Sequence, residues 1–194
     1  MPIGRDWPES AGSLPRSSTA VRYDAGMRMQ CPASLRKFGF CGVLATIYAA
    51  KLPMPTSIEK LKALLQEMKA VLAKPSGKWK RATPKNTGGI TFQDTLGLLE
   101  HYQACQHELL ITPNGNAGPT LKKWMKSITA NTCYIVHLPK HALFVEVGTV
   151  KSKWRLYDQG GVHTKTNTSF MDKKGGYGRQ KIRGLIRITY PHAN

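Results

Sequence analysis

The sequence lacks any long apolar run. No stretch of about 18 consecutive apolar residues occurs, and a membrane-spanning helix needs one. The opening residues, MPIGRDW, contain no apolar segment typical of a secretory signal. Hydrophobic residues still make up 41% of the 194 positions, which is enough to bury a core in a chain of one-domain length. We therefore expect a folded single domain without a membrane span, located in the cytoplasm or associated with a virion.

Cysteine is scarce, and the four cysteines, at positions 31, 41, 105 and 133, form no Cys-x-x-Cys pair. A chain of this length does not need disulfides in order to fold. A zinc site could draw on His101, Cys105 and His107, or on His137 and His141, but these spacings match no zinc finger or ribbon. We therefore expect reduced thiols, no metal and no cofactor.

Acidic residues are few as well: 11 Asp and Glu stand against 29 Lys and Arg, a net charge of +18 at pH 7. Such a surface usually meets a polyanion. Two basic segments, 74–85 and 173–187, also contain Trp79 and Tyr177, whose rings could stack on exposed bases. The candidate nucleic-acid contacts in them are Lys78, Lys80, Arg81, Lys173, Lys174 and Arg179. An acidic protein partner and a merely solvated surface are the alternatives.

The hydrophobic pattern changes along the chain. Residues 1–29, rich in Ser, Pro, Gly and Arg, predict an extended basic arm. Helical spacing, with Thr56 or Ser57 capping the second segment, recurs in residues 43–50, 57–72, 91–102 and 121–128. Strand patterns follow in residues 133–138, 142–147, 153–157 and 182–190. This order predicts an α+β domain over 30–194, with a helical half (30–130) and an antiparallel β half (131–194).

Cys41 lies where a glycine-containing turn meets the start of the first apolar helix. The free N–H groups and the dipole at a helix start stabilise negative charge, so this position predicts a lowered thiol pKa. Gly42, directly after it, would let a substrate carbonyl approach the backbone closely. The alternative is that Cys41 is a small buried hydrophobic residue without a chemical role.

His141 precedes an apolar strand, and Asp158 follows it by 17 residues, at the end of the next predicted strand. A hairpin of that length brings the carboxylate back beside the imidazole. The carboxylate can then hold the imidazole tautomer and leave the other ring nitrogen facing Cys41. Asp172 is an alternative acid, although the Lys-Lys-Gly-Gly segment after it is typical of a loop. His137 is expected to be packed or half exposed.

These motifs together resemble the papain-like cysteine peptidases. The similar parts are Phe40-Cys41-Gly42 opening an apolar helix, the segment HALFVEVG from His141, and the strand end Leu156-Tyr157-Asp158. They occur in the order Cys, His, Asp, and the branch that processes double-glycine leader peptides is the most similar. The resemblance covers roughly residues 30–160.

The resemblance implies a nucleophile at Cys41, a general base at His141, an orienting acid at Asp158, and a cleft between a helical and a β half. The family usually has an oxyanion-hole Gln about six residues before the nucleophile, where this chain has Leu35; Gln30 could serve only if the intervening loop bulges. We therefore expect a cysteine peptidase or isopeptidase with a polypeptide substrate. The alternatives are a basic structural or nucleic-acid-binding virion protein on the same fold, active or inactive, and a cell-wall amidase.

Overall fold

The computed structural model describes residues 30–72, 74–76, 90–113, 118–165, 171 and 176–190, and the structural statements below concern these residues. The predicted arm at 1–29 lies outside them. The described helices are α1 (Cys41–Ala49), α2 (Ile58–Val71), α4 (Phe92–Tyr102) and the short α5 (Leu121–Trp124), with 3-10 turns η1 (Ala33–Leu35) and η2 (Tyr177–Arg179). Among the described helices, none is both long and apolar enough to cross a membrane.

Side-chain caps define where α2 and α4 begin. The hydroxyl of Ser57 accepts the Lys60 N–H at the start of α2, which settles the choice between Thr56 and Ser57. At α4, Thr91 and Asp94 cap each other's backbone N–H groups in a capping box. The Asp94 carboxylate also accepts hydrogen bonds from the Ser76 backbone N–H (2.9 Å) and hydroxyl (2.7 Å), so it ties the segment after α2 to the start of α4.

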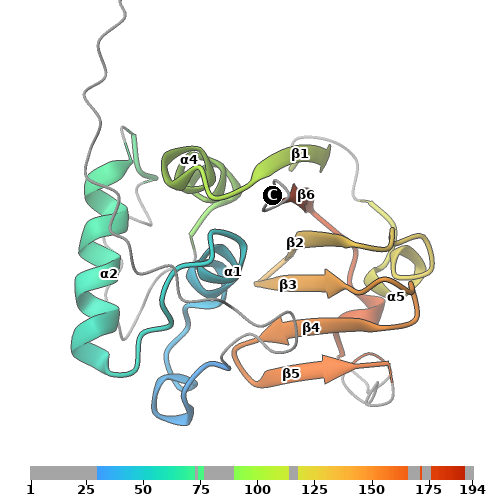
Figure 1. Ribbon diagram of the computed structural model, residues 1–194, viewed down its shortest axis with the longest axis horizontal. Coiled ribbons are helices and arrows are strands. Elements are labelled where there is room, and N and C mark those ends of the chain that lie inside the picture. The colour runs from blue at the N-terminus through green and yellow to red at the C-terminus, as the bar shows by residue number, and fades with distance from the viewer. Residues whose placement is uncertain are drawn as a thin grey trace, which may run out of the picture.

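The strands form one six-stranded sheet in which every neighbouring pair is antiparallel, in the order β1-β6-β2-β3-β4-β5. Figure 1 shows them stacked in this order from β1 at the top to β5 at the bottom. Their bounds are β1 (Gln106–Ile111), β2 (Thr132–Leu138), β3 (His141–Val147), β4 (Trp154–Asp158), β5 (Gly161–Thr164) and β6 (Gly184–Thr189).

The sheet is covered on both faces because its central strands alternate two sets of apolar side chains. One set, including Ile135, Phe144 and Ile186, packs with α1, α2 and α4 in the larger core. The other set, including Val136 and Leu143, packs under α5 in a second core. Helix α1 lies between α2 and the sheet (Figure 1), and every residue in it after Cys41 is buried, as its continuous hydrophobicity predicts.

The α+β class predicted from the sequence is confirmed, with three differences of detail. The fourth helix ends at Trp124 rather than near residue 128, and the hydroxyl of Ser127 donates to the Trp124 carbonyl just beyond its end. Strands β1 and β5 were not predicted. Because β1 pairs with β6, the chain segment assigned to the helical half also supplies an edge of the sheet.

Candidate active site

Cys41 is the first residue of α1 and is partly exposed, whereas the thiols of Cys31, Cys105 and Cys133 are buried. It lines a pocket of about 660 Å³ together with His141. Gly42 also lines this pocket, and its α-carbon lies against Ile90. A methyl group on that carbon would collide with the Ile90 side chain. The absence of a side chain at Gly42 is therefore required by packing at the start of α1, in addition to any role in substrate approach.

His141 is the first residue of β3, and its imidazole lies between two partners. Its Nε2 is 4.0 Å from Oδ2 of Asp158, which is ion-pair range but longer than a hydrogen bond. One ring face stacks on Tyr177 of η2, with the ring centroids 4.6 Å apart and the planes 8° from parallel. Nε2 is buried and has no hydrogen-bond partner among the described residues. A small shift of either side chain would bring Nε2 of His141 within hydrogen-bond distance of the Asp158 carboxylate.

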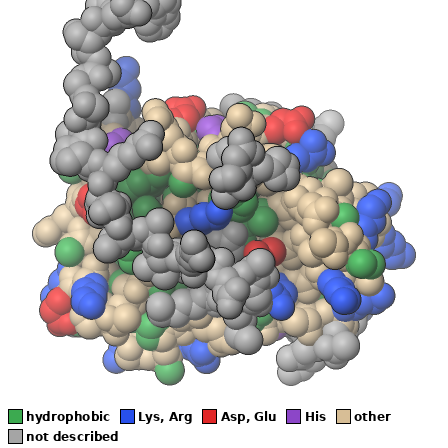
Figure 2. Space-filling model, viewed as in Figure 1, with side chains coloured by type: hydrophobic (Ala, Val, Ile, Leu, Met, Phe, Trp, Pro, Cys, Tyr) green, Lys and Arg blue, Asp and Glu red, His purple; other side chains and the backbone are tan. Residues whose placement is uncertain are grey.

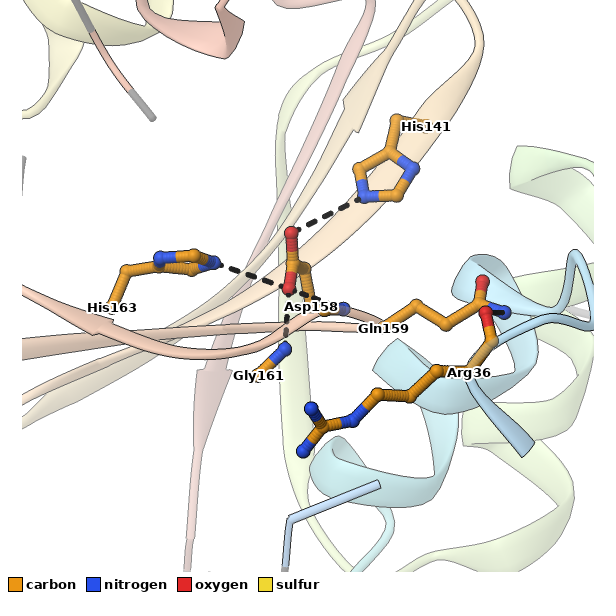
Figure 3. A network of polar contacts seen from close by, with 7 residues as sticks. Arg36, His141, Asp158, Gln159, Gly161 and His163 are labelled. Carbon is orange, nitrogen blue, oxygen red and sulfur yellow. Dashed lines mark hydrogen bonds and ion pairs between the residues drawn. The ribbon is translucent and has the colours of Figure 1, made fainter. Parts of the chain in front are cut away.

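Asp158 ends β4, and its Oδ1 is held by three donors. The backbone N–H groups of Gly160 and Gly161 donate to it at 2.7 and 2.9 Å, and Nε2 of His163 lies 3.2 Å away. Gly161 has a φ of 144°, a conformation that favours glycine and that closes the turn carrying these donors. Figure 3 shows the carboxylate between the imidazoles of His141 and His163, so Oδ1 is occupied and Oδ2 faces His141.

Burial controls the protonation of the three groups. Burial raises the pKa of the Cys41 thiol, and backbone N–H groups at Ala142, Gly42 and Cys41 lower it only in part. The helix start therefore does not give the lowered thiol pKa expected from the sequence. Burial also lowers the pKa of His141, against the opposing charge of Asp158. The resting site thus holds a neutral thiol and a neutral imidazole.

The carboxylate of Asp158 remains ionised. Burial alone would raise the pKa of Asp158, but the hydrogen bond from His163, the positive charge of either histidine when it is protonated, and the Gly160 N–H hold this pKa below its ordinary value. The site therefore contains one fixed negative charge, and it lies beside His141 and away from the bulk of the solvent.

Three neighbours of the site had not been assigned these positions from the sequence. His163, on the short strand β5, contacts Asp158; Tyr177 had been considered for base stacking, and its ring instead stacks on His141. Gln159 lines the pocket, and its amide nitrogen donates to the Arg36 carbonyl at 2.7 Å (Figure 3). Gln159 directly follows the predicted acid Asp158, and this position in the sequence could have suggested that it lies near the site.

The remaining candidates do not belong to the group formed by Cys41, His141 and Asp158. Gln30 is exposed and does not line the pocket, and Leu35, at the spacing where the family carries its Gln, is buried in the larger core. Asp172 lies outside the described residues. His137 does line the pocket, with its ring edge-on to Phe92 at 5.2 Å between centroids. Within the described ranges, no group of three or more His, Cys, Asp or Glu side chains is placed to hold a metal ion.

Five of the six candidate nucleic-acid contacts, Lys78, Lys80, Arg81, Lys173 and Lys174, lie outside the described residues. Arg179, the sixth, is exposed at the end of η2. On the face seen in Figure 2, the Lys and Arg side chains are spread around the molecule and not gathered over one element. The described residues on this face therefore do not show a concentrated basic patch of the kind that a nucleic-acid interface would need.

The raised pKa of Cys41 makes a testable prediction about its reactivity. Only the thiolate reacts with iodoacetamide, so the rate of alkylation at Cys41 should still be rising at pH 9.0, the ordinary pKa of a cysteine. The rate is measured by mass spectrometry of the peptide that contains Cys41, with the unfolded chain as the reference for a free thiol. A rate that is already maximal at pH 7 would contradict the neutral resting pair.

No family model, no curated protein and no solved structure matches this chain.

Proposed function

We propose that this protein is a cysteine peptidase or isopeptidase with a papain-like arrangement of helices and sheet, and that it hydrolyses an amide bond through a thioester on Cys41. The observation that carries the proposal is the grouping of three side chains: Cys41 and His141 line one pocket, and the Asp158 carboxylate, held by the Gly160 and Gly161 N–H groups, lies 4.0 Å from His141 Nε2. A thiol, an imidazole and an orienting acid in this order are the means by which thiol hydrolases activate their nucleophile.

In the first half of the reaction, Cys41 Sγ attacks the carbonyl carbon of the substrate. Because His141 Nε2 faces Asp158, Nδ1 is the nitrogen left to take the thiol proton. The tetrahedral intermediate then collapses, the C–N bond breaks, and His141 returns the proton to the leaving amine. The product of this half-reaction is an acyl group held on Cys41 as a thioester.

In the second half, water attacks the thioester carbon. His141 takes a proton from this water, the C–S bond breaks, and the proton returns to the sulfur. The acid product leaves and the neutral pair is restored. Asp158 stabilises the imidazolium that forms in each half and fixes its orientation, so it acts as a positioning residue.

The negative oxygen of each tetrahedral intermediate needs hydrogen-bond donors. The first is the backbone N–H of Cys41, which lies in the first turn of α1 and so has no carbonyl partner within the helix. We assign the second to the side-chain amide of Gln159, which lines the same pocket. Its nitrogen uses one N–H on the Arg36 carbonyl, which fixes the amide group and leaves the other N–H available.

An activated ester tests the proposal without knowledge of the natural substrate. The native protein should release p-nitrophenol from the p-nitrophenyl ester of acetylglycine over many turnovers, and mass spectrometry should detect the acetylglycyl group on Cys41. Cys41→Ala should lose both signals because the nucleophile is gone. Cys133→Ala, which alters a buried thiol on β2, is the matched control and should retain both.

Release by the native protein at no more than the Cys41→Ala rate would contradict the proposal. That outcome would favour the alternative, a basic binding protein on a similar fold, for which the net charge of +18 is the supporting observation.

A further inference from the structure

Two cationic side chains and no acidic one line the described part of the pocket that holds Cys41. Among the described residues that line it, Lys140 and Arg183 carry the charges, and none is Asp or Glu. Asp158 lies beyond His141, and its oxygens are already directed at the two glycine N–H groups and the two histidines. The described wall of this pocket therefore carries two positively charged side chains and no negatively charged one.

The two cations come from neighbouring connections of the sheet. Lys140 is in the tight turn between β2 and β3, directly before His141. Arg183 comes directly before β6, and its backbone N–H donates to the His137 carbonyl at 2.8 Å, so its backbone is fixed beside β2. Both side chains are exposed, and within the described ranges neither has an ion pair. Both are thus available to a ligand carboxylate.

The rest of the wall suits an extended peptide. Ile90 and Phe92 supply apolar surface, and Gly39 exposes backbone. His137 also lines the pocket. Burial lowers the pKa of His137 to about 4, so its ring is neutral near pH 7 and adds no charge to the wall.

We infer that the substrate is a polypeptide that carries a carboxylate within a few residues of the scissile bond, and that Lys140 and Arg183 bind this carboxylate. The inference rests on the proposed function, because it concerns the same pocket. Opposite charge on protein and substrate increases the association rate most strongly at low ionic strength. The net charge of +18 favours the same class of substrate at longer range.

Epoxysuccinyl peptides test the inference, because attack by a thiol opens the epoxide and marks the cysteine. Three probes differ only in a Glu, Gln or Lys beside the electrophile, and the Gln probe is made with either a free carboxylate or a carboxamide at its end. Comparison of the two forms of the Gln probe shows whether the pocket recognises a terminal carboxylate rather than an acidic side chain. The second-order rate of modification at Cys41 is followed by mass spectrometry.

The Glu probe should react about five- to thirtyfold faster than the Lys probe at low salt, which is the effect of two exposed charge pairs, and the ratio should fall as salt is added. In the double variant Lys140→Glu, Arg183→Glu the preference should reverse. Lys60→Glu, Lys62→Glu changes the net charge equally on the exposed face of α2 and should keep the native preference. The double variant Lys140→Gln, Arg183→Gln should react with the Glu and Lys probes at equal rates.

Each contrary outcome has a different meaning. If no probe modifies Cys41 faster than the three buried cysteines, the proposed function fails and this inference fails with it. If Cys41 reacts selectively but at one rate with the Glu, Gln and Lys probes, only this inference is overturned. It is also overturned if a short oligonucleotide, and not an acidic peptide, protects Cys41, because the cations would then be binding phosphate.

Discussion

Replacing His141 by alanine is expected to lower the rate of amide hydrolysis about 10²–10⁴-fold, the usual contribution of a positioned general acid–base group. Among the described residues, His141 is the only histidine that both lines the pocket with Cys41 and forms an ion pair with Asp158. The variant should lose kcat and retain KM for a fluorogenic peptide, because the imidazole moves protons and contributes little to binding the ground state. Its ring is only 16% exposed, so stability is measured by urea unfolding in parallel.

The pH profile of the native protein gives a second readout of His141. Burial lowers its pKa below the ordinary 6.5, so the imidazole is neutral and able to accept a proton from below pH 6.5 upward. The acidic limb of the kcat/KM profile should therefore have its midpoint below 6.5 and should disappear in His141→Ala. His101→Ala, a change on the exposed surface of α4, is the control and should leave both the rate and the limb unchanged. A His141→Ala rate within a factor of ten of the native rate would remove His141 from the chemistry.

The centre of the fold could be predicted because its sequence signals are local and strong. Continuous hydrophobicity after Cys41 predicts a buried helix, and the structure gives α1 with the rest of its residues buried. The strands β2, β3 and β4 are apolar, close together and separated by turn residues, so both their positions and their antiparallel pairing followed from the pattern. The shared pocket of Cys41 and His141 and the approach of His141 to Asp158 followed from those elements.

The edges of the sheet could not be predicted in the same way. β1 begins with Gln106, His107 and Glu108, all of its residues are at least partly exposed, and only β6 pairs with it. Its sequence is therefore typical of a polar connection. β5 spans only Gly161–Thr164 and exists because it pairs with β4. His163 was missed for this reason: its contact with Asp158 depends on a strand pairing that the local pattern does not reveal.

The environment of the site also depends on tertiary packing. The N-terminal position of Cys41 on a helix predicted a lowered thiol pKa, but the burial created by the surrounding chain is the larger effect and raises it. In the same way, Gln159 reaches the Arg36 carbonyl across the interface between the sheet and the helical side, a contact between residues 123 positions apart. Such contacts are determined by the packed fold and not by spacing along the chain.

Asp158 should affect both stability and activity, and two substitutions separate these roles. Asp158→Ala removes the acceptor for Gly160, Gly161 and His163, so we expect a loss of about 2–3 kcal/mol in the free energy of unfolding and of about 10²-fold in kcat as His141 loses its orientation. Asp158→Asn keeps an acceptor oxygen for the glycine N–H groups. It should cost about 1 kcal/mol in stability and should retain more activity than the alanine variant.

The charge of Asp158 makes its contribution to stability dependent on pH. Its folded pKa is lowered from 3.8, so the stabilisation is complete above the unfolded pKa and is lost as the pH falls through the lower folded value. The difference in urea midpoint between native protein and Asp158→Asn should accordingly be constant near neutral pH and should shrink below about pH 4. Asp94→Asn is the matched control, because Asp94 is also a buried, hydrogen-bonded carboxylate with a lowered pKa but it caps α4. The Asp94→Asn variant should lose stability without losing activity per folded molecule. If Asp158→Ala also retained full activity per folded molecule, Asp158 would have a structural role only.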